Sequence, residues 1–141
     1  MRHSQKAKYI ISTCMLAVGL FSAFILYRSF RPTAGLPYEK ITPEQAMEYM
    51  DYEEGYILLD IDDAEEYSSL HIAGAINIPY SQLLDKIVTE IPDKKKMIYL
   101  YGNDEVTADK AAVKLSELGY DNITMIGVLK DWTGNLEGSS V

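Results

Sequence analysis

The stretch YILLDIDD, residues 56–63, decides the fold class. Its first six residues form a run of strand length that is apolar apart from Asp60. Continuous rather than alternating apolarity is typical of a strand covered on both faces, as in a parallel sheet. Asp62 or Asp63 can then cap a short helix that extends to Leu70. The stretch therefore predicts a strand followed directly by a helix.

Strands and helices continue to alternate on either side of this unit. Upstream, Thr42 and Gln45 form a capping-box pattern around Pro43, which predicts the start of a helix. Downstream, apolar runs predict three more strands and a helix, with the strands at residues 75–78, 97–101 and 122–126 and the helix at residues 81–88. This alternation predicts an α/β domain with a mainly parallel sheet.

A further amphipathic helix follows the strand at residues 97–101. Thr107 is its predicted N-cap, and Gly119 is its predicted terminator. Small and apolar residues recur on one face of this helix: Ala108, Ala111, Ala112, Leu115 and Leu118. Such a stripe predicts a helix that packs on the sheet.

The N-terminal part of the chain predicts a membrane segment. Residues 9–27 contain no charged side chain, and a helix of that length measures roughly 28 Å, close to the thickness of a bilayer core. We expect a basic flank at residues 1–8, a transmembrane helix at 9–27, a linker at 28–37 and a domain at 38–141. A cleaved signal peptide is the alternative. Its apolar region is about 7–15 residues long, whereas this run is longer and Arg28 follows it at once.

The flanking charges predict an orientation for this single-pass segment. Three basic residues precede it and two follow closely: Arg2, Lys6 and Lys8, then Arg28 and Arg31. The positive-inside rule then places the N-terminus inside and the domain on the extracytoplasmic side. Cys14 is the only cysteine and lies within the span, where we interpret it as a packing residue. The domain therefore has no disulfide, cysteine nucleophile or cysteine-based metal site.

Charge divides sharply between the two parts of the chain. Residues 1–37 carry a net charge of +5, and residues 38–141 carry −13, with eight lysines against 21 acidic side chains. So acidic a domain repels nucleic acid and anionic lipid headgroups. The acidity serves either solubility or a basic protein partner.

Three separated segments resemble the rhodanese-like family. The first runs from residues 58–61 through 65–67 to HIAGAINIP at 71–79, close to the family signature H-I-P-G-A-x-N-I-P. The second is the strand at 97–101, its loop and a helix ending at 118–120. The third is Gly127 with Trp132, which matches G-G-x-x-x-W except for Val128. The resemblance covers residues 38–134 and implies a rhodanese-like fold with helices on both faces of the sheet. His71 is expected to tie down a loop, because a lone histidine lacks the cluster of a catalytic or metal site.

The same resemblance identifies the loop that decides activity. In active rhodaneses a cysteine begins the loop after the third strand, and inward backbone N–H groups at a helix start hold its anionic persulfide. An ungapped alignment places Gly102 at the nucleophile position of this chain. The candidate ligand loop is then Gly102, Asn103, Asp104, Glu105, Val106 and Thr107.

Other features of the family's chemistry are absent as well. Asp104 and Glu105 bring negative charge to a place built to accept anions. Asp62 stands where the family often has an arginine after the strand aspartate. The resemblance therefore implies a catalytically degenerate member without a cofactor, and the related cysteine-phosphatase chemistry is excluded too.

Three functions remain open at this point. The first is a non-catalytic binding or regulatory module that contacts a partner through the loop and its acidic rim. The second is an altered enzyme that holds a divalent ion, with Asp60, Asp62, Asp63, Asp104 and Glu105 as candidate ligands against the simpler interpretation of helix caps and solvated surface. The third is sulfurtransfer assisted by a partner's thiol.

Two structural expectations accompany these functions. Tyr99 and Tyr101 alternate onto one strand face and could line the emptied pocket. A carboxylate of Asp104 or Glu105 is expected to fold back onto backbone N–H groups of the loop or first helical turn, since a helix start favours negative charge. The anion site would then be filled by the protein itself.

Overall fold

The computed structural model describes residues 36–140. The predicted transmembrane helix at residues 9–27 lies outside this range, as do its basic flank and most of the linker. Within the described range, none of the helices is long and apolar enough to cross a bilayer.

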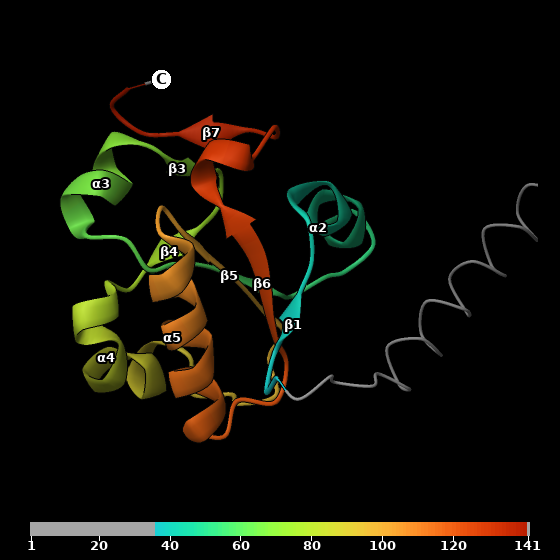
Figure 1. Cartoon of the computed structure of the whole chain (residues 1–141), viewed down its shortest axis with the longest axis vertical. Coiled ribbons are helices and arrows are strands. Elements are labelled where there is room, and N and C mark those ends of the chain that lie inside the picture. The colour runs from blue at the N-terminus through green and yellow to red at the C-terminus, as the bar shows by residue number, and fades with distance from the viewer. Residues whose placement is uncertain (1–35, 141) are drawn as a thin grey trace, which may run out of the picture. The chain divides into compact units, whose positions relative to one another are not determined.

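A five-stranded parallel sheet forms the centre of the domain, in the order β1-β6-β5-β2-β4 (Figure 1). Its strands are β1 (Glu39–Lys40), β2 (Ile57–Asp60), β4 (Ile76–Asn77), β5 (Ile98–Gly102) and β6 (Ile123–Val128). All residues of the central strand β5 are buried, as continuous apolarity predicts. The mainly parallel sheet expected from the sequence is confirmed.

Helices cover both faces of this sheet, which confirms the predicted layers. Figure 1 shows α4 (Leu83–Glu90) and α5 (Glu105–Glu117) against one face and α2 (Pro43–Met50) against the other. The first pair buries Leu83, Ile87, Ala108, Ala111, Ala112 and Leu115 in the larger core cluster. Ala46 of α2 packs in the second cluster with Tyr99, Tyr101 and Ile126. The alanine stripe of α5 brings that helix close to the sheet, because its side chains are small.

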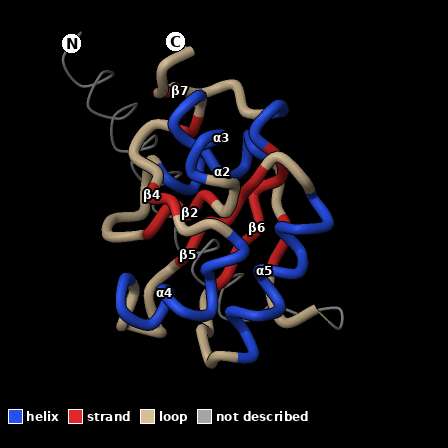
Figure 2. Tube along the Cα trace, turned by 90° about the vertical axis from the view of Figure 1, so that its left-hand side faces the viewer, coloured by secondary structure: helices blue, strands red, loops and turns tan. Residues whose placement is uncertain are grey.

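The carboxyl ends of the strands point toward the end of the domain where α3 (Ala64–Ser69) lies. Figures 1 and 2 agree in placing α3 at this end and α4 toward the opposite end. A small antiparallel pair lies here as well, formed by β3 (His71–Ile72) and β7 (Leu136–Glu137). This end is where ligands collect in open α/β sheets.

The predicted capping box of α2 is present. The Thr42 hydroxyl accepts the N–H of Gln45 at 3.3 Å, and the Gln45 side chain accepts the N–H of Thr42 at 3.0 Å. For α3, the structure selects Asp63 rather than Asp62 as the N-cap. The Asp63 N–H donates to Glu66 Oε2 at 3.4 Å.

The start of α5 differs from the sequence-based expectation. Its N-cap is Asp104 and not Thr107, because the Asp104 carboxylate accepts both the N–H of Thr107 at 2.8 Å and its hydroxyl at 2.6 Å. Thr107 therefore lies at the third helical position. The candidate loop shortens accordingly, since Gly102 ends β5 and Glu105, Val106 and Thr107 form the first turn of the helix.

Two other boundaries also shift. The strand expected at residues 75–78 is reduced to Ile76–Asn77, because Pro79 begins a turn that leads into a 3-10 helix at Tyr80–Gln82. The helix expected at residues 81–88 becomes α-helical only from Leu83 and continues to Glu90. A second 3-10 helix, Leu129–Asp131, follows β6.

Candidate functional site

Asp62 and Gly102 lie close together at the carboxyl edge of the sheet, where β2 and β5 run side by side. Asp60 pairs with Tyr101 in register, so Asp62, two residues after the end of β2, lies close to Gly102, the last residue of β5. A Cβ atom on Gly102 would lie 3.0 Å from Asp62 Oδ1 and 3.0 Å from Ile61 Cγ1. The backbone at Gly102 has no positive φ, so a side chain here is opposed by the tight space and not by the backbone conformation.

Asp62 holds the turn that follows β5. Its Oδ1 accepts the backbone N–H of Asn103 at 2.8 Å, although 41 residues separate the two. Its own N–H donates to Asp60 Oδ1 at 2.8 Å, and its carbonyl oxygen accepts from the Asn77 side chain at 2.8 Å. Asp62 is only 8% exposed, and its Oδ2 is buried without a hydrogen-bond partner in the described residues.

The site raises the pKa of both buried carboxyls. For Asp62, burial raises the pKa to about 6, against the opposing effect of the Asn103 N–H. The negative charges of Asp60, Glu66 and Asp63 add to this increase. Burial also raises the pKa of Asp60, although the Tyr101 hydroxyl and the Asp62 N–H oppose it. The edge of the sheet therefore carries two carboxyl groups whose ionised form is disfavoured by burial.

The two acidic residues of the candidate loop behave differently from Asp62. Asp104 is exposed, and its hydrogen bonds to the hydroxyl and N–H of Thr107 lower its pKa. The expected contact between an acidic loop residue and a backbone N–H is thus confirmed for Asp104. The Glu105 side chain is directed toward β1 instead, where its carboxylate lies 3.4 Å from Lys40 Nζ. Sequence reasoning missed the contact between Asp62 and Asn103, although both follow strands that a parallel sheet can place side by side.

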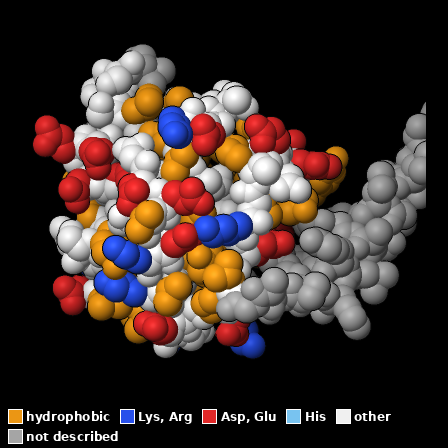
Figure 3. All heavy atoms as spheres, in the orientation of Figure 1, with side chains coloured by type: hydrophobic (Ala, Val, Ile, Leu, Met, Phe, Trp, Pro, Cys, Tyr) orange, Lys and Arg blue, Asp and Glu red, His pale blue; other side chains and the backbone are white. Residues whose placement is uncertain are grey.

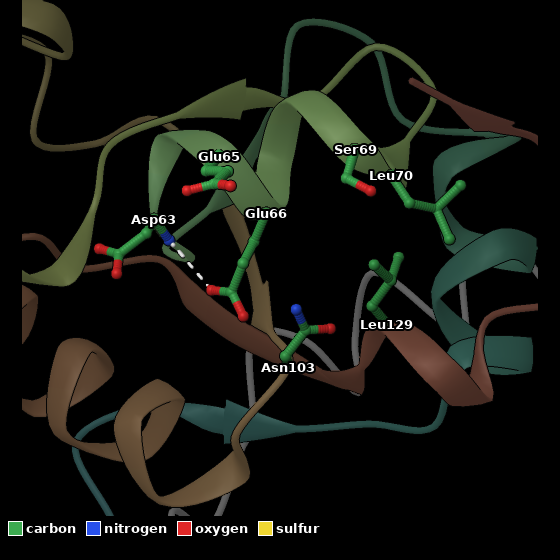
Figure 4. A pocket seen from close by; sticks show the side chains of 7 residues that line it. All are labelled: Asp63, Glu65, Glu66, Ser69, Leu70, Asn103 and Leu129. Atoms are coloured by element: carbon green, nitrogen blue, oxygen red, sulfur yellow. Dashed lines mark hydrogen bonds between the residues drawn. The ribbon is translucent and has the colours of Figure 1, made fainter. Parts of the chain in front are cut away.

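A pocket of about 460 Å³ opens beside this turn (Figure 4). Its walls are formed by Asp63, Glu65, Glu66, Ser69, Leu70, Asn103 and Leu129. In Figure 4, the Glu66 carboxylate extends from α3 toward Asn103, while Leu70 and Leu129 form an apolar wall on the other side. Figure 3 shows acidic side chains gathered on the surface over α3. The pocket therefore combines an acidic side with an apolar side.

The two tyrosines expected near the site lie in the core. Tyr99 and Tyr101 are fully buried and do not line this pocket. The Tyr101 hydroxyl accepts the N–H of Ile72 at 3.0 Å, and the Tyr99 hydroxyl donates to Glu53. Their hydroxyl groups are satisfied by the surrounding fold, so the expectation that they line the emptied pocket was wrong.

His71 has the structural role that the sequence predicted. Its ring stacks on Tyr67 with centroids 3.9 Å apart, and Nδ1 lies 2.7 Å from the Tyr67 carbonyl oxygen. Its Nε2 lies 3.6 Å from a carboxylate oxygen of Glu137 on β7. These contacts connect α3, β3 and β7.

The candidate metal ligands do not gather into one site. Across residues 36–140, no three histidine, cysteine or acidic side chains are placed to hold a common ion. Asp63 and Asp104 cap two different helices, whereas Asp60 and Asp62 each accept a backbone N–H. The helix-cap interpretation describes Asp63 and Asp104 better than a divalent-ion site.

Comparisons with known proteins agree with this architecture. The family described as Rhodanese-like domain matches residues 42–135. Thiosulfate sulfurtransferase PspE from Escherichia coli (strain K12) is 37% identical over 73 residues, which cover 52% of this chain and 70% of that protein. Centrosomal protein of 41 kDa B from Xenopus laevis is 35% identical over 78 residues, which cover 50% of this chain and 21% of that protein.

A solved structure adds to the comparison. Rhodanese with anions from E. coli superposes with a TM-score of 0.54 and 30% sequence identity. The superposition covers 60% of this chain and all of that one.

Proposed function

The chain belongs to the rhodanese-like domain family, and we propose that it is a non-catalytic member that binds a basic partner at the acidic pocket beside Asn103. The proposal includes a membrane tether formed by residues 9–27, with the domain on the extracytoplasmic side. Such a module would act by binding its partner, and thereby regulate or recruit it, and not by catalysis.

The first support is the lack of a nucleophile. The family is related to sulfurtransferases, and sulfur transfer of that kind needs a thiolate that carries the sulfur atom. The resemblance places Gly102 where that cysteine would stand, and residues 38–141 contain no cysteine. The domain by itself therefore has no sulfur atom on which a persulfide can form.

The observation that carries the proposal is the hydrogen bond between Asp62 and Asn103. A backbone N–H at the start of the turn, which in an anion cradle would face the ligand, here donates to a carboxylate of the chain itself at 2.8 Å. Asp104 occupies the N–H of Thr107 in the same way. An incoming sulfur oxyanion would meet both an occupied donor and the Asp62 charge. The turn thus disfavours the anionic substrates of sulfur transfer.

The pocket beside the turn suits a positively charged group. Its acidic side offers the carboxylates of Asp63, Glu65 and Glu66, and its apolar side offers Leu70 and Leu129. A lysine or arginine side chain fits this combination, because its aliphatic stem can cover leucine while its cation reaches the carboxylates. A basic polypeptide segment is therefore the partner class that we propose. The overall charge of −13 on residues 38–141 would steer such a partner toward the domain.

The proposal is tested by peptide binding to the full chain in detergent micelles. A fluorescein-labelled hexalysine peptide is titrated at low ionic strength and pH 7.5 against the native chain and the pocket variant Glu65→Gln/Glu66→Gln. We expect the pocket variant to weaken binding about tenfold, since each exposed ion pair contributes up to about 1 kcal/mol.

A matched control separates the pocket from general acidity. Glu90 and Glu117 are exposed acidic residues on α4 and α5 and do not line the pocket. The variant Glu90→Gln/Glu117→Gln makes the same charge change and is expected to bind within about twofold of the native chain. Equal losses in the two variants, or no binding by the native chain, would refute the proposed site.

A further inference from the structure

We propose that Asp62 is a proton-operated clamp on the turn after β5, and that its protonation weakens the adjacent pocket for a basic partner. This regulation rests on the function proposed above for the pocket. It assigns to Asp62 a role that neither the family's chemistry nor a helix cap provides.

The geometry connects the clamp to the pocket through one residue. Asn103 donates its backbone N–H to Asp62 Oδ1 at 2.8 Å, and its side chain forms part of the pocket wall (Figure 4). Asp62 itself is anchored by two backbone contacts, its N–H to Asp60 and its carbonyl to Asn77. The Asp62 carboxylate is therefore a fixed point to which the turn after β5 is held.

The surroundings of Asp62 make its charge costly. From β2, Asp60 faces it as a buried carboxyl, and from α3 the charges of Asp63 and Glu66 act on it. From β5, Tyr101 interacts electrostatically with Asp62, and at the start of α5 the Asp104 carboxylate is engaged by Thr107. From β4, Asn77 contributes a neutral amide. Its Oδ2 has no hydrogen-bond partner in the described residues.

Protonation then changes two properties of the site together. A hydrogen bond to a carboxylate is about twice as strong as one to a neutral carboxyl, so the hold on Asn103 weakens. One negative charge beside the acidic wall is also lost. Burial raises the pKa of Asp62 to about 6, so both changes fall between neutral and mildly acidic pH. Asp104, whose pKa is lowered, keeps its charge in this interval.

The direct test follows the backbone amide of Asn103. Amide proton and nitrogen shifts of the ¹⁵N-labelled full chain in detergent micelles are recorded from pH 4.5 to 8. We expect the Asn103 amide to titrate with a midpoint near 6 in the native chain and in Asp104→Asn, and to stay flat in Asp62→Asn. An Asn103 amide that is flat in the native chain, or that still titrates near pH 6 in Asp62→Asn, would overturn the proposal.

The functional arm uses the hexalysine peptide and keeps the two proposals distinguishable. Between pH 7.5 and pH 5.5 the dissociation constant is expected to rise about threefold for the native chain, as loss of one nearby charge predicts, and to change little for Asp62→Asn. A native chain that binds at pH 7.5 with no such difference from Asp62→Asn refutes the clamp and leaves the pocket standing. No binding at pH 7.5 refutes the pocket, and the amide titration still decides the contact between Asp62 and Asn103.

Discussion

The Asp62 carboxylate lies against Gly102, and its Oδ1 is only 3.0 Å from the position that a Cβ atom at residue 102 would take. The absence of a side chain at 102 leaves room for the carboxylate to reach the N–H of Asn103. Under the proposed function, glycine at the nucleophile position and occupation of the turn by Asp62 are two aspects of one local arrangement. Restoration of one residue alone is not expected to restore the family's chemistry.

Gly102→Cys is expected to give an unreactive thiol. Its Cβ would press on Asp62 and Ile61, and the Asp62 charge would raise the pKa of the thiol, since the thiolate and the carboxylate repel each other. The measurement is the rate of iodoacetamide alkylation as a function of pH, in a Cys14→Ala background. We expect the thiol to react more slowly at pH 7.5 than free cysteine, with its midpoint above about 8.5.

A second substitution, added to Gly102→Cys, identifies which carboxylate raises the pKa of the thiol. Gly102→Cys/Asp62→Ala should lower the thiol's midpoint by about one unit or more, whereas Gly102→Cys/Glu105→Gln should change it little, because Glu105 points toward Lys40. The acidic pair expected from the sequence to oppose a thiolate was Asp104 and Glu105. Equal shifts in the two double variants would restore that interpretation and contradict the structural account.

Asp62→Asn is expected to stabilise the domain at neutral pH. The pKa of Asp62 is raised above its usual value to about 6 in the folded state, so the folded chain holds a proton there more tightly than the unfolded chain. This group's contribution to stability is full at low pH and is lost as pH rises through about 6. Asparagine keeps an oxygen acceptor for Asn103 without the buried charge.

Urea denaturation at several pH values measures this effect. At pH 7.5 we expect the free energy of unfolding of Asp62→Asn to exceed that of the native chain by roughly 1–3 kcal/mol. The difference should shrink toward zero near pH 4. A variant that is less stable than the native chain at pH 7.5, with no convergence at low pH, would show that the ionised carboxylate stabilises the fold instead.

Membrane topology is open to a protease test in intact cells with permeable walls. With the N-terminus inside, added protease should remove the domain and leave a fragment slightly larger than the predicted anchor at residues 9–27. Protection until lysis would reverse the orientation, and a free domain in the culture supernatant would favour the cleaved signal peptide.

Much of the fold was predictable because buried parallel strands have a strong sequence pattern. The apolar runs of β2, β5 and β6 lie where the sequence placed them, and the stripe that begins at Ala108 does pack on the sheet. The two-residue strands β1, β3 and β7 were not predicted, because so short a segment has no periodicity. Their pairing is decided by the surrounding tertiary structure.

The site was less predictable because it depends on contacts between distant residues. Asp104 and Thr107 are both good N-caps, and the choice between them depends on where β5 ends. The bond between Asp62 and Asn103 requires β2 and β5 to be neighbours, which the order of strands along the chain does not state. The pocket likewise joins α3, the turn after β5 and Leu129.

The most direct test of the central claim is a thiosulfate:cyanide sulfurtransferase assay on the purified full chain, with the E. coli relative PspE as the positive control. Thiocyanate is measured over a range of thiosulfate concentrations at pH 7.5 and pH 5.5, without any added thiol. The account predicts no thiocyanate above the buffer control at either pH, because the domain has no sulfur nucleophile and the turn is occupied by Asp62. Turnover that is saturable in thiosulfate and clearly above the control would contradict it.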